Sequence, residues 1–564
     1  MNGSQLSMGC IGVCAMVLLG PACGGGGSGA GGSGAGTSTT SDTTTTTDTT
    51  STSVTTGAGG DPTGTGGSGV GGGTGGSATG GGGAGGAIPV TCGDGKIDVG
   101  EECDDGDKNA NISACTLACK KALCGDGFVQ SGVEECDQGA QNSNAGACTL
   151  ACKVAVCGDG LKAPSEGCDD GNMIEADGCN PNCVVSGAPL WSQTYAGAGN
   201  GIDVWNAVTA DSAGNVIATG RETVGGQGAN VITRKYDGSG NVLWTQTYAG
   251  VVAGGDDEGN GVAADAAGNV VVIGYESTAA QGKNIWLRKY GPNGAVLWTQ
   301  SVNGSPLINF DDIGYGVAAG PGGDFYIAAS AQTTAGQGRD TIVGKISGAD
   351  GNFIWFDTYN GVVSQDDEAR TVAFDGAGNI VTAGVTRGPT SFDVWVRKIA
   401  DLGGSKSITW TSTYNGLADG LDVGFAIDVD AQGNPVVVGA ETVTGQGLNM
   451  WICKFSSAQG NPLWTQGYDG PAHKNDIAEG VIIDAVGNVI VAGFDSQADL
   501  STNVRIRKYT AAGTLLWTQF YNGAANDNDA ANGVTVDASG SIFIAGFENV
   551  NGQNANALLR KHAP

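Results

Sequence analysis

The most regular residues with chemical potential in this 564-residue chain are seven aspartates. Each stands five residues before an apolar position of a predicted strand. A recurring Asp can accept backbone hydrogen bonds in a tight loop, bind a cation such as calcium, or act as a catalytic carboxylate. Because an asymmetric active site is not repeated sevenfold, loop shaping is the first interpretation, and ligand or cation binding is the second. The seven residues are Asp203, Asp257, Asp312, Asp367, Asp422, Asp476 and Asp529.

Histidine chemistry is almost absent, because the chain has only His473 and His562. Neither a catalytic Ser-His-Asp set nor a metal-binding His pair can be assembled from these two histidines. His473 precedes Asp476 on a predicted loop and is the best single residue for acid–base chemistry, although a lone surface His is usually incidental. The sequence therefore predicts a protein that is not an enzyme and has no cofactor, with calcium as the one cation worth testing.

A tryptophan repeat indicates the elements that position these aspartates. Versions of LWTQTYAG recur seven times between Trp191 and Trp517, at intervals of 53 to 57 residues. A period of this size is typical of solenoids and propellers. Each unit contains four short runs rich in β-branched and aromatic residues, separated by Gly, Asn and Asp, which predicts four strands. Hairpin-turn spacing and the count of seven favour an all-β, seven-bladed β-propeller over a linear β-solenoid.

The two ends of the array predict how the ring closes. Residues 189–195 form a fourth strand without the three before it, and residues 556–562 form a third strand without a fourth. Pairing these segments completes the seventh blade. The repeat resembles the seven-bladed β-propeller repeat family of bacterial surface proteins, a resemblance that implies a fold and no reaction.

A propeller would place the aspartates at one end of its central channel, because first strands line that channel. We expect them to ring or flank its mouth, on the face with the longer and more variable loops, where binding residues usually lie. Each third strand also carries a Lys. We expect these lysines to keep their amines in water and not to pair with the seven aspartates.

Twelve cysteines between 92 and 183 form three units of four. Units of about 32 residues with few apolar groups need disulfides for stability, which leaves three pairings open in each unit. Zinc is disfavoured because the segment lacks C-x-x-C pairs and histidine. Asp105, Asp107 and Asn109 form a weak calcium candidate. The cysteines are Cys92, Cys103, Cys115, Cys119, Cys124, Cys136, Cys148, Cys152, Cys157, Cys168, Cys179 and Cys183.

The motif CGDG…GEECDDG…C…C in these units resembles the Myxococcus cysteine-rich repeat of myxobacterial surface proteins. The resemblance implies an extracytoplasmic location and a myxobacterial source. The units occupy residues 89–186 in the predicted domain order, before a propeller over 187–564.

The N-terminal segment predicts export. Residues 1–23 contain an apolar run too short to span a bilayer and then a small-residue site before Cys23, as in a signal peptide. This site resembles the lipobox of bacterial lipoproteins, which implies a lipid on Cys23; simple secretion is the alternative. Residues 24–88 are rich in Gly, Ser and Thr and predict a disordered tether.

Charge limits the partners, since the formal net charge is −30. This charge repels nucleic acid and anionic membranes, so membrane contact is expected only through the lipid. We expect a monomeric cell-surface, outer-membrane or secreted protein for binding or adhesion, with an extracellular polysaccharide or protein as partner. The alternatives are a metal-dependent lyase or hydrolase on the acidic face, and a structural spacer with no specific ligand.

Overall fold

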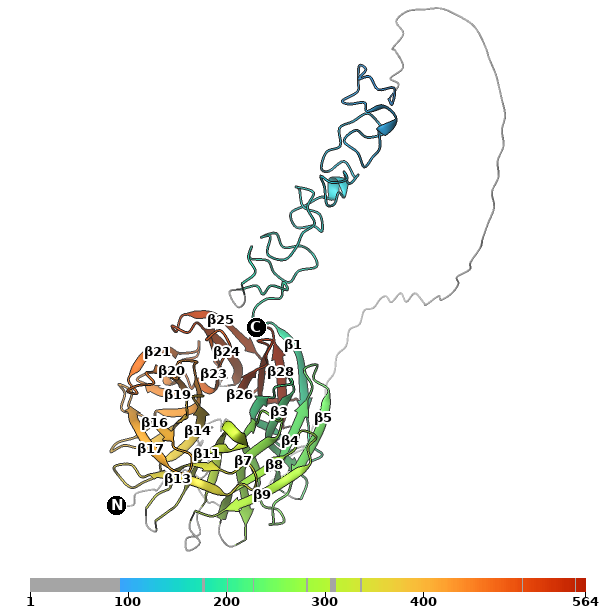
Figure 1. The fold of residues 1–564 in the computed structure, drawn as a ribbon. Coiled ribbons are helices and arrows are strands. Elements are labelled where there is room, and N and C mark those ends of the chain that lie inside the picture. Colours follow the sequence, from blue (N-terminus) through green and yellow to red (C-terminus); the bar gives the residue numbers. More distant parts are fainter. Residues whose placement is uncertain are drawn as a thin grey trace, which may run out of the picture.

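The computed structural model describes residues 92–174, 178–199, 201–226, 228–279, 282–304, 311–334, 337–499, 501–552 and 554–564. Cys23 and the predicted signal segment and tether lie outside these ranges. The chain forms a narrow cysteine-rich rod that leads into a ring of β-sheets (Figure 1). Within the described ranges, no helix has both the length and the apolar character needed to cross a membrane.

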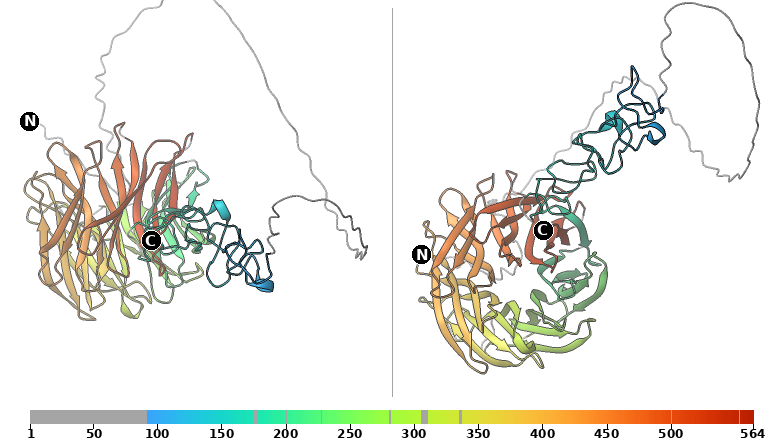
Figure 2. Two further views of the ribbon diagram at one scale, coloured as in Figure 1. Left: turned by 90° about the horizontal axis from the view of Figure 1, so that it is seen from above. Right: turned by 45° about the horizontal axis from the view of Figure 1, so that its top comes forward.

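The ring is a seven-bladed β-propeller, as predicted, with four antiparallel strands in each blade (Figure 2). Blades 1 to 3 consist of β2 (Val204–Ala210), β3 (Val216–Val224), β4 (Gly228–Tyr236), β5 (Val242–Tyr248); β6 (Glu258–Ala264), β7 (Val270–Thr278), β8 (Gly282–Tyr290), β9 (Val296–Val302); and β10 (Ile313–Ala319), β11 (Phe325–Ala331), β12 (Asp340–Ile346), β13 (Phe353–Tyr359).

Blades 4 to 6 repeat this arrangement. They consist of β14 (Glu368–Phe374), β15 (Asn379–Arg387), β16 (Phe392–Asp401), β17 (Lys406–Tyr414); β18 (Val423–Val429), β19 (Pro435–Val443), β20 (Gly447–Phe455), β21 (Pro462–Tyr468); and β22 (Ile477–Ile483), β23 (Val489–Ser496), β24 (Thr502–Tyr509), β25 (Leu515–Tyr521).

Blade 7 closes the ring with strands from both ends of the array. It contains β26 (Asp529–Val536), β27 (Ile542–Asn549), β28 (Ala555–His562) and β1 (Pro189–Tyr195). β1 pairs antiparallel with β28, with Tyr195 opposite Ala557. The predicted closure is therefore confirmed, and the first strands of neighbouring blades contact one another around the whole ring, including β26 with β2.

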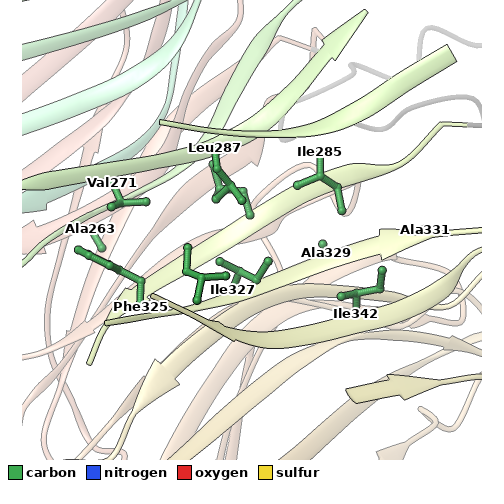
Figure 3. Close-up of a cluster of buried hydrophobic side chains, with 11 residues drawn as sticks. Ala263, Val271, Ile285, Leu287, Phe325, Ile327, Ala329, Ala331 and Ile342 are labelled. Carbon is green, nitrogen blue, oxygen red and sulfur yellow. The ribbon is translucent and has the colours of Figure 1, made fainter. Parts of the chain in front are cut away.

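Apolar side chains between neighbouring sheets hold the blades together. One cluster joins blades 2 and 3, where Val271 and Leu287 face Phe325 and Ile327 (Figure 3). All four side chains are fully buried. Burying one such side chain stabilises a fold by ~1.5–3 kcal/mol, so these inter-blade layers form the main core. The recurring Trp adds a polar link, as when Trp244 Nε1 donates to the carbonyl of Pro292 in the next blade.

The repeated lysines lie differently from the expectation. Six of the seven are buried and Lys561 is partly buried, and each forms an ion pair with the Asp of the first-to-second turn, as in Lys235 Nζ to Asp211 Oδ2 at 2.7 Å. The expectation of amines in water was wrong because the blade edges converge on the neighbouring turn. Lys235 also donates to the carbonyl of Pro292 in the next blade. The other pairs are Lys289–Asp265, Lys345–Asp324, Lys398–Asp375, Lys454–Asp430, Lys508–Asp484 and Lys561–Asp537.

Every first strand contains a β-bulge, and in six of the seven blades a glycine on the second strand makes room for it, with Ala329 at this position in blade 3. In blade 2 the register shifts between Gly259 and Gly261, so Asn260 is the extra residue. A Cβ on Gly274 would lie 1.8 Å from the carbonyl oxygen of Glu258. Gly274 therefore lets β6 and β7 approach each other at the bulge. Bulges re-aim side chains, and here they lie beside the central channel.

The rod consists of the three cysteine-rich units. Each has the same nested pairing, with the first cysteine bonded to the fourth and the second to the third. The bonds are Cys92–Cys119, Cys103–Cys115, Cys124–Cys152, Cys136–Cys148, Cys157–Cys183 and Cys168–Cys179. The predicted disulfide framework is confirmed, and the pairing that the sequence left open is now defined.

The described residues of the rod contain three isolated β-bridges and two 3₁₀ turns, η1 (Gly106–Lys108) and η2 (Gly139–Gln141). A further 3₁₀ turn, η3 (Pro321–Gly323), lies in blade 3. The rod is joined to two blades: Asn180 Nδ2 donates to the carbonyl of Pro564, which follows β28 of blade 7, and Gln519 Nε2 on β25 of blade 6 donates to the carbonyl of Ser186. These bonds place the rod at the rim of blades 6 and 7.

Candidate functional site

The seven recurring aspartates, called here the anchor aspartates, are buried at the start of the first strands. The carboxylate of Asp476 accepts hydrogen bonds from the backbone N–H groups of Gly470 at 2.5 Å and Ser496 at 2.9 Å. Asp529 accepts from Gly523 and Asn549 in the same way. Each anchor aspartate thus ties the loop from the preceding blade to the end of its own second strand.

Burial sets the electrostatics of the anchor aspartates. It raises the pKa of Asp312, Asp476 and Asp529 to about 6, although the backbone donors oppose the shift. It also raises the pKa of the other four. None exceeds 2% exposure, and none lines the channel cavity described below. Of the two expected arrangements, ringing or flanking the mouth of the channel, an exposed ring around the cavity is not observed. Cation binding at these residues remains a prediction, and their contacts support the loop-shaping interpretation.

The weak calcium candidate in the rod has other contacts. Asp105 and Asp107 are exposed, whereas Asn109 is buried. Asn109 accepts a hydrogen bond from the backbone of Asp105 and donates one to Asp104. Asp104 in turn accepts from the backbone of Gly93 and Gly106, so the carboxylate that shapes this unit is one that the sequence reasoning missed.

Two other residues with chemical potential lie apart from the anchor aspartates. His473 is an exposed loop residue that pairs with Asp469, and Cys453 is buried as the free cysteine of the described part. Burial raises the pKa of the Cys453 thiol to about 12. Within the described residues, neither His473 nor Cys453 forms part of a catalytic set.

The central channel contains a second sevenfold set, which we call the channel ring. Each member stands three residues after an anchor aspartate and is the bulged residue of its first strand. In contrast to the anchor aspartates, the channel ring differs between blades. Its members are Asn206, Asn260, Tyr315, Arg370, Phe425, Glu479 and Asn532.

Blades 7, 1 and 2 carry the asparagines of the channel ring. Each uses its amide to contact the next blade: Asn532 donates to Trp205, Asn206 to Gly259 and Asn260 to Gly314, all at carbonyl oxygens. This arrangement is structural, because it joins successive first strands by hydrogen bonds. We therefore call asparagine at this position the plain form of the repeat, because its role there is structural.

Blades 3 to 6 replace asparagine with Tyr315, Arg370, Phe425 and Glu479. The guanidinium of Arg370 lies 5.6 Å from the ring centre of Tyr315 and 5.0 Å from that of Phe425. Its Nη2 is 2.7 Å from Glu368 Oε2, and the other oxygen of Glu368 is 2.6 Å from Arg339 Nη2. Two guanidinium groups therefore share one carboxylate at this side of the channel.

Arg370 retains unused hydrogen-bonding capacity. Its side chain is only 8% exposed, yet among the described residues its Nε and Nη1 have no hydrogen-bond acceptor. Leaving a buried donor unpaired costs ~1–3 kcal/mol, so the arrangement is expensive for a purely structural residue. An unpaired buried group of this kind calls for an explanation, such as a bound water, ion or ligand.

Carboxyl groups around Arg370 have opposite pKa shifts. Burial alone would raise the pKa of Glu368, but Arg370 and Arg339 outweigh it and hold that pKa below its ordinary value. Burial raises the pKa of Glu479 to about 7, against the opposing field of Arg370. Burial also raises the pKa of Asp428, farther along the channel, to about 6. Such separated values are typical of functional sites.

The channel ring and the residues after it enclose a cavity of about 400 Å³. The last residue of every first strand is partly exposed, whereas the first residue is buried in six of the seven first strands. The cavity therefore opens toward the short first-to-second turns, and the channel ring forms its floor. The sequence analysis predicted binding on the opposite face, which carries the longer and more variable loops. Ala, Gly, Val and Ile supply most of the wall.

A sequence signal for this site existed. Once the units are aligned on the anchor aspartates, the third residue after each reads Asn, Asn, Tyr, Arg, Phe, Glu and Asn. A variable position inside an otherwise uniform repeat marks the place where blades are not equivalent. The bulge that turns this position to the channel is a backbone feature, so composition and strand periodicity did not reveal it.

Comparisons with known proteins identify part of the rod. Residues 147–184 match the family model described as a domain of unknown function, DUF4215. The acetylcholinesterase collagenic tail peptide of Torpedo marmorata is 54% identical over 45 residues, which are 8% of this chain and 9% of that protein. The chain thus spans about a tenth of that relative.

Solved structures share only low similarity with the chain. BamB from Moraxella catarrhalis is 11% identical, with a TM-score of 0.36 over 67% of this chain and 99% of that one. Sqt1 from Chaetomium thermophilum, bound to the N-terminus of ribosomal protein L10, is 12% identical, with a TM-score of 0.39 over 63% and 85%. A Dyadobacter fermentans protein of unknown function is 9% identical, with a TM-score of 0.39 over 67% and 100%. Similarity at this level does not indicate function.

Proposed function

We propose that this chain is an extracytoplasmic binding protein that presents a ligand-binding propeller on a disulfide-stabilised rod. The observation that carries the proposal is the channel ring. Seven blades share one architecture, but the residues at the floor of the cavity differ between blades in size, charge and hydrogen bonding. Local variation on a rigid scaffold is the usual basis of recognition.

The rod supports the placement outside the cytoplasm. Six disulfides in fewer than a hundred residues are stable in an oxidising compartment and rare in a reducing one. Together with the lipobox-like site at Cys23, this supports a lipid-anchored or secreted bacterial protein whose tether and rod hold the propeller away from a surface.

A binding screen of the full mature chain tests the proposal. Purified cell-envelope fractions and a glycan array should retain the protein saturably, with and without calcium. A double variant, Phe425→Asn with Glu479→Asn, restores the plain form of the repeat at two positions and should reduce retention at least fivefold. Asp499→Asn, at an exposed loop acid, is the matched control and should leave retention unchanged.

Other results of the screen distinguish the alternatives. Absence of saturable retention would contradict the binding proposal and favour a spacer without a specific ligand. Turnover of a retained substrate that stops on addition of a chelator would instead indicate the metal-dependent lyase or hydrolase.

Lipid attachment needs a separate test. We expect radiolabelled palmitate to be incorporated into the wild-type chain and to disappear in Cys23→Ala. Labelling that persists in the variant would show that Cys23 is not the anchor, and the protein would then be either secreted or attached at another residue.

A further inference from the structure

We propose that the channel cavity binds a small monocarboxylate with an apolar body, whose carboxylate is held by Arg370 beside Phe425. The inference rests on the proposed binding function and assigns a ligand class to its site. It follows from the unused donors of Arg370, the charge around it, and the composition of the cavity wall.

The donors of Arg370 define the part of the ligand that is recognised. Glu368 occupies Nη2, while Nε and Nη1 remain unpaired among the described residues. A planar guanidinium in a partly desolvated site favours an oxyanion acceptor, and the resulting hydrogen bonds are charge-assisted. A carboxylate would satisfy donors whose burial otherwise costs stability.

The balance of charge favours a monoanion over phosphate. Arg370 and Arg339 share Glu368, and Asp366 lies 3.8 Å from Arg339, so two carboxylates already balance the two guanidinium groups before Glu479 is counted. Asp428 adds a further carboxyl group along the same channel. A dianion would bring two negative charges into this acidic surrounding, whereas a monocarboxylate brings only one.

The cavity wall defines the rest of the ligand. Apart from the channel ring, it consists mainly of small aliphatic residues, such as Val208, Ile427 and Val481, and Phe425 presents a partly exposed ring. At about 400 Å³ the cavity lies in the range of small-molecule sites, which are mostly apolar with a few placed polar groups. A short aliphatic or aromatic acid fits this pattern.

Benzoate is a direct probe of this site, with benzamide as its uncharged counterpart. Calorimetric titration of the full mature chain should give saturable benzoate binding with a dissociation constant below about 1 mM, and at least tenfold weaker binding of benzamide. Arg370→Met should reduce benzoate affinity at least tenfold. Arg288→Met removes the same charge on an outer strand, where Nε donates to Thr299, and should change nothing.

A second variant tests the proposal in the case that Arg370→Met does not fold. Phe425→Ala leaves both ion pairs of Glu368 in place, and should weaken benzoate binding at least threefold while the protein melts cooperatively. Equal affinities for benzoate and benzamide would overturn the proposal, as would no benzoate binding or wild-type affinity in Arg370→Met. If envelope or glycan retention persists in that case, only the ligand assignment fails; if retention is also absent, the binding function fails with it.

Discussion

The anchor aspartates and the channel ring lie three residues apart in every blade, but the first set is identical between blades and the second set varies. The anchor aspartates are identical in every blade, buried, and bonded to backbone N–H groups. The channel ring, three residues later, varies from asparagine to arginine, glutamate and aromatic side chains. Uniformity therefore accompanies a role in forming the blade, and variation accompanies a surface where the blades need not be equal.

This contrast changes where function is sought in a repeat protein. The most conspicuous chemical group of the sequence, seven regularly spaced carboxylates, is occupied by structural hydrogen bonds. The unusual chemistry lies in an arc of four blades around Arg370, where a buried cation has two aromatic neighbours and unpaired donors.

Deleting residues 189–195 should have the largest effect, because it removes β1 and opens the ring on which both sets depend. β28 would lose one of its two strand partners and would become an exposed edge of blade 7. We expect the variant to show no cooperative thermal transition of the propeller by circular dichroism. A melting curve like that of the wild type would refute closure by β1.

Asp476→Ala should separate the anchor aspartates from binding. The change leaves the N–H groups of Gly470 and Ser496 without their acceptor, so we expect the free energy of unfolding to fall by ~2–4 kcal/mol. Benzoate affinity measured below the melting range should stay within twofold of wild type. Asp527→Ala, at an exposed acid of a between-blade loop, is the control and should cost less than ~0.5 kcal/mol.

The anchor aspartates should also give stability a definite pH dependence. Their pKa in the folded protein is raised, to about 6 for Asp312, Asp476 and Asp529, above the usual value of 3.8. Their contribution is therefore full below pH 3.8 and is lost as pH rises through about 6. Asp476→Asn should reduce this loss by on the order of 1 kcal/mol in denaturant unfolding between pH 4 and 7. An unchanged slope would contradict the assignment.

Benzoate affinity should fall as pH rises through about 7, the pKa to which burial raises Glu479. Ionised Glu479 competes for Arg370 and repels the ligand, while Glu368 is already ionised and Asp428 loses its proton near pH 6. The expected loss is about threefold between pH 6 and 8. Glu479→Gln should abolish the loss of benzoate affinity above pH 6.5. If the affinity of this variant still declines above pH 6.5, another group causes the effect.

Calcium removal should have the smallest effect. The anchor carboxylates already accept backbone hydrogen bonds, so we expect a chelator to shift the melting temperature by less than about 1 °C. A shift of several degrees that calcium reverses would revive the cation interpretation of these aspartates, or of Asp105, Asp107 and Asn109 in the rod.

Much of the fold could be predicted from the sequence because repetition amplifies weak signals. The pattern of a single strand is ambiguous. The recurring Trp motif, the turns and the separated strand at residues 189–195 together predicted seven blades and the closure of the ring. The disulfide pairing could not be predicted, because four cysteines in a short unit allow three arrangements until the backbone path is known.

The site was harder to predict for two physical reasons. The lysines were placed in water because a strand pattern does not show that Lys235 reaches Asp211 and the next blade. The channel ring was missed because a β-bulge inserts one residue and redirects its side chain, which breaks the alternation used to assign faces. Its only trace was the variable third position after each anchor aspartate.

The most direct test of the central claim makes the channel ring uniform. A variant with Tyr315→Asn, Arg370→Asn, Phe425→Asn and Glu479→Asn gives blades 3 to 6 the residue found in blades 1, 2 and 7. We predict a cooperative melt, with β-sheet circular dichroism like that of the wild type, and no measurable benzoate binding in calorimetry. Wild-type benzoate affinity in this variant, or loss of the folded propeller, would contradict the division between a uniform structural set and a variable binding set.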